Sequence, residues 1–301
     1  MKSGAVEEKS AAMKAQARKN FIAKYGSLMA LILLCVLIAL VRPRFFSFLN
    51  IRNVLRLASI NGLLAIGMTF VCLTGGIDLS VGAVMGCAGM YSAFFAQVGM
   101  NQPAIVAVAV GVGMGLAIGL FNGVCIAYLK VPPFVGTLGS MSIAESLTYL
   151  LTNAKPIPNL SDSFKWIGGG MIGGTIPVPI IIFIGILLIS FLLLYKMRYG
   201  RYVFAVGGNM MAARISGINT KRIIASVYVI SGVLSALAGV ITSARVTSGV
   251  TNTGEGYETD AIAMVVIGGT SLSGGKGRLW GTIVGILLMV CLSSGLDMLG
   301  V

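Results

Sequence analysis

The sequence predicts an all-α protein that crosses a membrane several times. Of its 301 residues, 56% are hydrophobic and 10% are charged, and the mean hydropathy is +0.94. Soluble domains of this size do not have such a composition. The 41 glycines are typical of membrane helices that pack closely through small residues. The net charge is +13, but the basic residues fall between apolar runs, as the positive-inside rule requires, so nucleic acid is not an expected partner.

The chain divides into a polar tail at 1–24 and a transmembrane domain at 25–301. The tail carries six basic residues and lacks a small-residue cleavage pattern, so it is expected to stay in the cytoplasm. Histidine is absent and the five cysteines lie in or beside apolar runs. Neither a zinc site nor a disulfide framework is therefore expected.

Apolar runs predict nine spans. The fourth has Gly111, Gly115 and Gly119 on one face, where a neighbouring helix can approach closely. The fifth is the least apolar, so we expect it to be partly re-entrant or to line a cavity. The eighth is expected to begin before its apolar part and to bend. In order, the runs are Tyr25–Val41, about Val54–Leu73, a third that ends near Gln97, Pro103–Tyr128, Phe134–Thr152, Pro177–Tyr195, Ile223–Ala244, Ala261–Gly269 and Leu279–Leu299.

The connections between these runs set the orientation. With the tail inside and the spans alternating, 15 of the 22 basic residues fall on the inner side and seven on the outer side. This bias favours a cytoplasmic N-terminus. Four of the outer basic residues belong to one connector between the first two spans; they are Arg42, Arg44, Arg52 and Arg56.

The longest polar interval within the body of the chain is Lys196–Asn219, part of a basic region at about 196–222 that holds no acidic residue. Gly207–Asn209 predicts a turn or helix start, and Met210–Ser216 predicts a short helix that Gly217 closes. Such a helix suits docking into a groove of a cytoplasmic partner. The residues alone equally allow a solvated positive-inside loop.

Motifs of covalent chemistry and of phosphate binding are absent from the sequence. It contains neither GxSxG nor HExxH. The glycine-rich stretch Gly268–Arg278 lacks the P-loop pattern, because Gly277 follows Lys276 and Thr270 stands where the first glycine should be. We therefore expect no ATP site and no cofactor on this chain.

Four stretches together resemble the permease subunits of ATP-driven sugar importers, the ribose/xylose/galactose branch of ABC transporters. The resemblance runs from about Phe45 to Val301. It implies a type II ABC-importer-like bundle with about ten spans and both termini cytoplasmic, in a bacterial inner membrane. A tenth span of about twenty residues, which this sequence does not include, is therefore expected. The four stretches are Asn61–Ser80, Gly200–Ile218, Ser235–Ala244 and Gly254–Leu299.

The resemblance also implies partners and a substrate. Separate ATPase subunits would hold ATP and Mg, a periplasmic binding protein would deliver a monosaccharide (ribose or a related sugar), and a second copy of the chain would complete the permease. The short basic helix would be the coupling helix that enters the ATPase. The residues that match its motif are Gly207, Gly208, Asn209, Ala212, Ala213, Arg214 and Gly217.

Two further groups of residues are candidates for contacts with partner and solute. Arg42, Arg44, Arg52 and Arg56, with Arg245, are expected to dock acidic residues of the binding protein; the alternative is anchoring to lipid headgroups. Intramembrane acids are costly unless paired. Asp78 is expected to be the N-cap of the third helix or, alternatively, to line the translocation path. Glu145, with Ser142 and Thr148 nearby, is the other candidate for that path.

The rival function is an ion-coupled secondary transporter of a small polar solute. Such carriers also use repeats and broken helices, and a Gly-Gly-x-x-Leu-Ser pattern does recur, at Gly75–Ser80 and Gly268–Ser273. Six residues do not establish a repeat, however, and only Asp78 and Glu145 are candidates for binding an ion. A structural membrane scaffold is the third alternative, and no feature of the sequence favours it.

Overall fold

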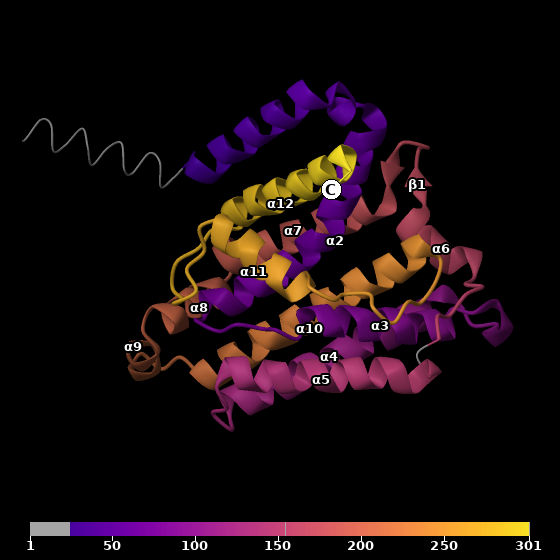
Figure 1. Cartoon of the computed structure of the whole chain (residues 1–301). Coiled ribbons are helices and arrows are strands. Elements are labelled where there is room, and N and C mark those ends of the chain that lie inside the picture. The colour runs from indigo at the N-terminus through magenta and orange to yellow at the C-terminus, as the bar shows by residue number, and fades with distance from the viewer. Residues whose placement is uncertain (1–24, 154, 301) are drawn as a thin grey trace, which may run out of the picture.

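The computed structural model describes residues 25–153 and 155–300 and shows a bundle of helices (Figure 1). Five helices are long and apolar enough to cross a membrane: α2 (Phe48–Leu73), α4 (Ala104–Ala127), Val178–Lys196, α10 (Thr220–Val246) and α12 (Leu279–Leu299). Shorter apolar helices accompany them, among them Tyr25–Val41. The prediction of a polytopic helical membrane protein is confirmed.

The remaining elements are short or lie between these helices. The third of the five spans consists of α7 (Val178–Phe191), which continues into the π-helical η3 (Leu192–Lys196). Strands β1 (Met171–Ile172) and β2 (Ile176–Pro177) form a small antiparallel hairpin. The other elements are η1 (Pro43–Phe46), α3 (Val81–Phe95), η2 (Val98–Met100), α5 (Pro133–Thr152), α6 (Asp162–Gly169), α8 (Arg198–Gly208), α9 (Met210–Ile215) and α11 (Tyr257–Ile267).

Helix α2 forms the centre of the core. Every side chain from Leu63 to Leu73 is buried, and α2 packs against α7, α10, α11 and α12. A continuous apolar run with no polar stripe is what a helix surrounded by other helices requires. The predicted second span began at about Val54, whereas α2 begins at Phe48, because the Ser47 hydroxyl accepts the Asn50 N–H (3.3 Å) and starts the helix earlier. The predicted connector is thus partly helical.

The small-residue face predicted for the fourth span is confirmed. A Cβ on Gly115 of α4 would overlap the Gly232 carbonyl oxygen of α10, and a Cβ on Gly119 would lie 2.7 Å from the Tyr228 carbonyl oxygen. The two backbones therefore touch, which only glycine permits at these positions.

Two of the predicted spans, the third and the eighth, correspond to helices that are too short to cross a bilayer. Helix α3 has 15 residues and α11 has 11, which correspond to about 22 Å and about 16 Å against a hydrocarbon core of about 30 Å. Each follows a non-helical segment, at 74–80 and at 247–256. The predicted eighth span does begin early, at Tyr257, but at 11 residues it is only part of a span.

The non-helical segments of the bundle do not lie in the fifth predicted span. Helix α5 is continuous from Pro133 to Thr152, which favours the second of the two alternatives predicted for the fifth span, that it lines a cavity. The interruptions instead precede α3 and α11, and the N-terminal ends of these two helices meet: a Cβ on Gly82 would overlap the Gly254 carbonyl oxygen. Non-helical backbone at membrane depth is tolerated only where protein surrounds it or a cavity adjoins it.

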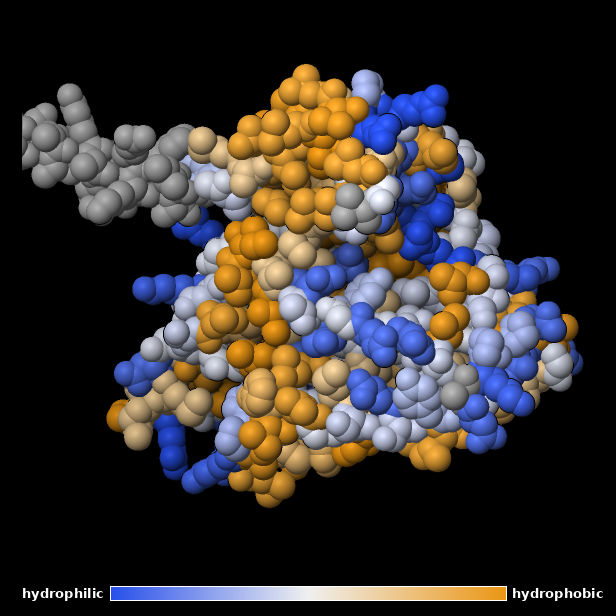
Figure 2. All heavy atoms as spheres, viewed as in Figure 1, coloured by the Kyte–Doolittle hydropathy of each residue, from blue (hydrophilic) through white to orange (hydrophobic). Residues whose placement is uncertain are grey.

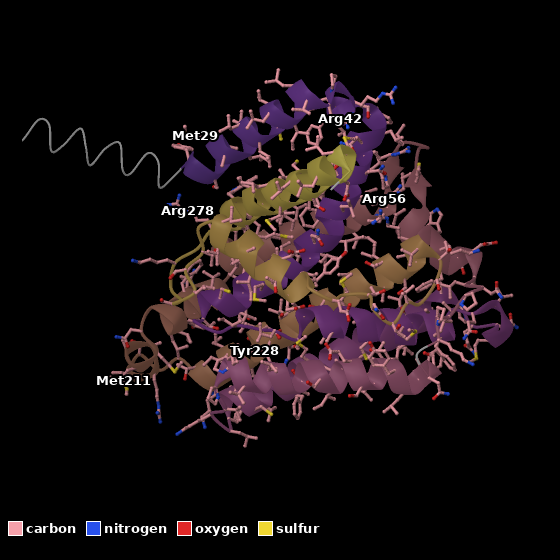
Figure 3. All side chains as sticks on the ribbon, in the orientation of Figure 1. Met29, Arg42, Arg56, Met211, Tyr228 and Arg278 are labelled. Carbon is pink, nitrogen blue, oxygen red and sulfur yellow. The ribbon has the colours of Figure 1, made fainter. Side chains whose placement is uncertain are left out.

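The two ends of the bundle carry the two groups of basic residues (Figure 3). Arg42 and Arg56 lie toward the end where β1 lies, and Met211 and Arg278 lie toward the end where α8 and α9 lie. The outer face of the Tyr25–Val41 helix is apolar and exposed, and Figure 2 shows a hydrophobic surface over it. Such a surface suits contact with lipid or with another subunit.

Candidate functional site

The predicted short helix between the sixth and seventh spans is present as α9. The Asn209 side chain caps it by accepting the Ala212 N–H (3.0 Å). Gly217 ends it with φ of +82°, a left-handed conformation that favours glycine. Ala213 is buried, whereas Met211 and Ile215 are 66% and 81% exposed. The helix therefore buries a small residue against the bundle and exposes large apolar side chains, Met211 and Ile215 most of all.

Three separate chain segments meet where α8 ends. We call this contact the glycine junction; it is formed by Leu73, Gly75, Gly207, Gly274 and Gly275. The Gly275 N–H donates to the Leu73 carbonyl oxygen (2.9 Å). A Cβ on Gly207 would overlap that same oxygen, and a Cβ on Gly274 would lie 2.9 Å from the Gly75 nitrogen. The segment that carries α9 is thus in backbone contact with the 74–80 segment and with the glycine-rich turn.

Asp78 lies in the middle of the 74–80 segment and is buried. Its carboxylate accepts hydrogen bonds from the Ser80 N–H (3.0 Å), the Ser80 hydroxyl (2.6 Å) and the Ser231 hydroxyl of α10 (2.8 Å). The prediction that Asp78 is the N-cap of the third helix is wrong, because Ser80 holds that position. Asp78 instead fixes the segment to α10, and three hydrogen bonds offset part of the cost of its burial.

Further hydrogen bonds fix the same segment to its neighbours. The Tyr228 hydroxyl of α10 donates to the Ile77 carbonyl oxygen (3.3 Å), and the Asn122 amide of α4 donates to the Ser80 hydroxyl (2.9 Å). The 74–80 segment therefore joins the glycine junction at one end to the start of α3 at the other, with α4 and α10 holding it between.

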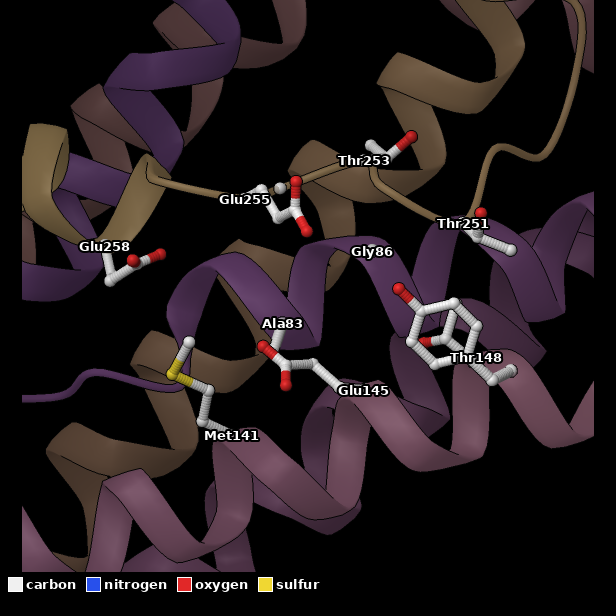
Figure 4. Close-up of a pocket in the computed structure, with 11 residues that line it drawn as sticks. Ala83, Gly86, Met141, Glu145, Thr148, Thr251, Thr253, Glu255 and Glu258 are labelled. Carbon is white, nitrogen blue, oxygen red and sulfur yellow. The ribbon is translucent and has the colours of Figure 1, made fainter. Parts of the chain in front are cut away.

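A polar cavity of about 90 Å³ lies where α3, α5 and the start of α11 meet (Figure 4). Two residues predicted for the path line it, Glu145 and Thr148, both on α5. Ser142 does not; it is exposed and its hydroxyl donates to the Leu138 carbonyl oxygen (3.4 Å). Asp78 is not among the lining residues, which are Ala83, Gly86, Met141, Glu145, Thr148, Tyr149, Thr251, Thr253, Gly254, Glu255 and Glu258.

Sequence reasoning missed the contribution of the 247–256 segment and of α11. Four polar residues between the predicted seventh and eighth spans, where the sequence indicates only a polar loop, line the cavity opposite α5; they are Thr251, Thr253, Glu255 and Glu258. Glu258 stands in the first turn of α11, and its Oε2 is buried without a hydrogen-bond partner. The available signal was the density of acidic and hydroxyl residues beside a short apolar run.

All charged groups in the lining of the cavity are negative. Its lining includes three carboxylates and three threonine hydroxyls but no lysine or arginine. Within residues 25–153 and 155–300, no three acidic or cysteine side chains are grouped closely enough to hold a metal ion. The arrangement can therefore accept hydrogen bonds from a solute rich in hydroxyl groups, and it disfavours an anion.

The predicted docking arginines fall into two groups. Arg56 of α2 lies within electrostatic range of Arg52 and of Arg245 on α10, and the Nε atoms of Arg52 and Arg56 are buried without a partner. We call Arg52, Arg56 and Arg245 the arginine cluster. Arg42 and Arg44 are exposed at η1. The cluster leaves guanidinium groups available to an anionic partner.

Lys165 of α6 forms an ion pair. Its Nζ lies 2.7 Å from Asp162 Oδ1 in α6. The hydrogen bond and charge of Lys165 lower the pKa of Asp162. Because both groups lie at the surface, this pair contributes little to stability.

Comparison with known proteins identifies similar sequences over almost the whole chain. A protein family described as "Branched-chain amino acid transport system / permease component" matches residues 50–301. The ribose import permease of Escherichia coli K12 is 42% identical over 287 residues, covering 94% of this chain and 88% of that protein.

Two further relatives give the same result. The ribose import permease of Bacillus subtilis 168 is 44% identical over 280 residues, covering 92% of this chain and 86% of that protein. The galactose/methyl galactoside import permease of Salmonella typhimurium LT2 is 34% identical over 308 residues, covering 96% of this chain and 92% of that protein. No solved structure matches.

Proposed function

Since the chain belongs to the permease-component family that matches its residues 50–301, we propose that it is the membrane-spanning subunit of an ATP-driven monosaccharide importer. The observation that carries this proposal is the 42% identity to a ribose import permease across 94% of the chain. Ribose, or a closely related sugar, is the proposed substrate. The chain itself performs no covalent chemistry and binds no cofactor in this proposal.

The lining of the polar cavity favours a sugar over an amino acid. The family description names branched-chain amino acids, whose carboxylate calls for a cationic or N–H-rich site. The cavity instead offers Glu145, Glu255 and Glu258 with three threonines and no basic side chain. Neutral hydroxyl groups can donate to these oxygens without charge repulsion. The cavity is thus a proposed part of the translocation path, as predicted for Glu145 and Thr148.

The ATPase partner is proposed to bind at α9. Its exposed Met211 and Ile215 are large apolar side chains on a helix that rests on the bundle, and such side chains are suited to filling a groove. ATP and Mg would be held by the ATPase. The glycine-rich turn of this chain contacts Gly207 and Gly208 through Gly274 and Gly275, which is packing between backbones.

The structure suggests how movement of α9 could reach the solute. Helix α8 touches Leu73 at the glycine junction, and Asp78 in the following segment is bound to Ser231. The segment then enters α3, whose Gly82 touches Gly254 beside the cavity. Because each step is a backbone contact or a buried hydrogen bond, a displacement of α8 is transmitted rather than absorbed.

The binding protein is proposed to dock at the opposite end, on the arginine cluster together with Arg42 and Arg44. Arg52 and Arg56 are half-buried and form no ion pair within the described residues, so their guanidinium groups can pair with carboxylates of an incoming acidic surface. Contacts of this kind mainly set the encounter rate and orientation, and salt screens them. Lipid headgroups are the alternative partner for the same arginines.

A second copy of the chain is the proposed dimer partner. Glu145 is only half-buried on α5, and a carboxylate facing hydrocarbon would cost about 2.5–3.5 kcal/mol on insertion scales. A second subunit packed over this side of α5 would keep it away from lipid. We propose location in the bacterial inner membrane with the N-terminus in the cytoplasm, on the basic-residue bias of the connections.

Uptake by reconstituted vesicles distinguishes this function from that of an ion-coupled carrier. Short helices preceded by non-helical segments, such as α3 and α11, would also suit such a carrier. Vesicles that hold the permease, its ATPase and binding protein are loaded with ATP, and uptake of labelled ribose is measured. The proposal requires uptake that depends on all three components and continues after an uncoupler is added. Uptake that proceeds without ATP and stops with the uncoupler identifies a carrier instead.

A further inference from the structure

A groove of about 550 Å³ lies beside α9, separate from the cavity and bordered at Gly75 by the glycine junction. Four parts of the chain form it: the start of the 74–80 segment, the turn that joins α4 to α5, α9, and the N-terminal part of α10. Its volume falls within the range of about 300–1,000 Å³ typical of small-molecule sites. Its lining is Thr74, Gly75, Gly76, Ile126, Ala127, Lys130, Val131, Pro132, Pro133, Met210, Met211, Arg214, Thr220, Lys221, Ile224 and Tyr228.

The charge of this groove is entirely positive. Lys130, Arg214 and Lys221 line it, and no aspartate or glutamate does. None of the three forms an ion pair within the part of the chain that the structure describes. The Lys221 Nζ lies 5.5 Å from the centre of the Tyr128 ring, a cation–π contact that leaves its N–H donors without an anionic partner. Three cations without a counter-charge form a site for an anion.

The rest of the lining is mainly apolar, and much of it lies at the ends of membrane helices. Ile126, Val131 and Ile224 line the groove together with Met210 and Met211. Helix α4 ends at Ala127, α5 begins at Pro133 and α10 begins at Thr220. The groove therefore lies at the level where hydrocarbon gives way to headgroups on the side of α9, with cations and apolar walls together. A soluble anion such as inorganic phosphate would make no favourable contact with these apolar side chains.

We propose that this groove binds an anionic phospholipid, with the phosphate at Lys130, Arg214 and Lys221 and the start of an acyl chain along the apolar wall. Basic pockets between membrane helices on the cytoplasmic side are a recurring form of lipid recognition. An acidic segment of the ATPase would match the charge, but it would leave the apolar wall of Ile126, Val131 and Ile224 without an apolar partner.

Such a lipid would connect the coupling helix to the rest of the bundle. Arg214 belongs to α9, whereas Lys130 and Lys221 belong to the α4–α5 turn and α10, so one headgroup would join α9 to two elements that it otherwise touches little. Tyr228 lines the groove and also donates to the Ile77 carbonyl oxygen next to Asp78. The lipid would thus hold α9 against the same segment that leads to the cavity.

The test compares two double variants of the full-length permease in nanodiscs of phosphatidylcholine doped with phosphatidylglycerol. Lys130→Gln/Lys221→Gln removes two headgroup contacts, and Lys196→Gln/Lys276→Gln removes the same charge from the same end of the protein outside the groove. Phosphatidylglycerol retained on the protein is counted by native mass spectrometry as its fraction in the nanodisc is raised. A third sample contains excess inorganic phosphate, and a fourth contains the ATPase.

The groove variant should bind phosphatidylglycerol about 30-fold more weakly than the unmodified chain, as expected for the loss of two contacts of about 1 kcal/mol each. The control variant should bind within a factor of about two of the unmodified chain. Equal weakening in both variants would show attraction by overall charge and overturn the proposal. Displacement by inorganic phosphate would identify a free-anion site, and loss of lipid when the ATPase binds would assign the groove to the ATPase. Either result also overturns it. Failure of ribose uptake in the vesicles would leave the lipid measurement unaffected.

Discussion

Substitution of Gly207 by alanine isolates the contact through which α8 and α9 are proposed to move the rest of the bundle. A Cβ at this position would overlap the Leu73 carbonyl oxygen and lie 2.6 Å from the Gly275 nitrogen and 2.9 Å from the Leu73 carbonyl carbon. All three neighbours are backbone atoms, so no rotamer change can make room. Helix α8 must therefore move away from the 74–80 segment, by about 1 Å or more if a normal Cβ contact is to be restored.

Gly208 provides the matched control. It is the next residue of the same helix, but a Cβ there would meet nothing within 4 Å. Alanine in place of glycine within a helix stabilises by about 0.5–1 kcal/mol when there is room. Overpacking a tight contact costs about 1–3 kcal/mol. The two substitutions are chemically identical and should act in opposite directions.

The assay measures sugar uptake and ATP hydrolysis in the same vesicles, together with co-purification of the ATPase. We expect Gly207→Ala to retain the ATPase, because α9 itself is unchanged, but to transport about tenfold less ribose per ATP hydrolysed. Gly208→Ala should keep the ratio of the unmodified chain. Equal ratios in the two variants would refute the idea that the glycine junction transmits the movement.

Three further predictions concern the cavity, the outer surface and the buried carboxylate. Glu258→Gln should lower ribose uptake about five- to tenfold, because a hydrogen bond to a charged acceptor is worth about 1 kcal/mol more than one to a neutral acceptor. Asp260→Asn, in the same helix but outside the cavity lining, should leave uptake unchanged. Equal losses in the two variants would show that Glu258 is not part of the translocation path. Arg52→Ala/Arg56→Ala should weaken stimulation of ATP hydrolysis by the binding protein at low salt, with a smaller difference at high salt; unchanged stimulation would leave lipid anchoring as the role of these arginines. Ser231→Ala should lower the free energy of unfolding by about 1–3 kcal/mol, because Asp78 loses one of its hydrogen bonds while remaining buried; a thermal midpoint equal to that of the unmodified chain would contradict this.

The features that sequence could predict are those determined by neighbouring residues. The cap at Asn209 and the stop at Gly217 are local, and both are present in α9. The spacing of Gly111, Gly115 and Gly119 is also local, and it does mark a surface of close helix contact. The identity of the partner helix, α10, could not be read from that spacing.

The features that sequence missed depend on segments far apart in the chain. Glu258 looked like part of an outer loop, because an 11-residue helix gives too short an apolar run to show that it starts within the bundle. Asp78 looked like a helix cap, because its partner Ser231 lies 153 residues away. The two Gly-Gly-x-x-Leu-Ser stretches are too short to establish a repeat from sequence. In the fold they contact each other, because Gly75 lies against Ser273 and Gly274. In all three cases the surroundings of the residue are set by segments that are distant in sequence.

Affinity of the ATPase subunit for the permease, measured in nanodiscs, is the most direct test of the claim that this chain is driven through α9. Met211→Asp/Ile215→Asp places two charges on its exposed apolar face, and Phe46→Asp places one on an exposed residue at the opposite end. Loss of an interface anchor of about 2 kcal/mol weakens binding about 30-fold, so the α9 variant should bind the ATPase at least that much more weakly while Phe46→Asp binds normally. Undiminished binding by the α9 variant would contradict the account.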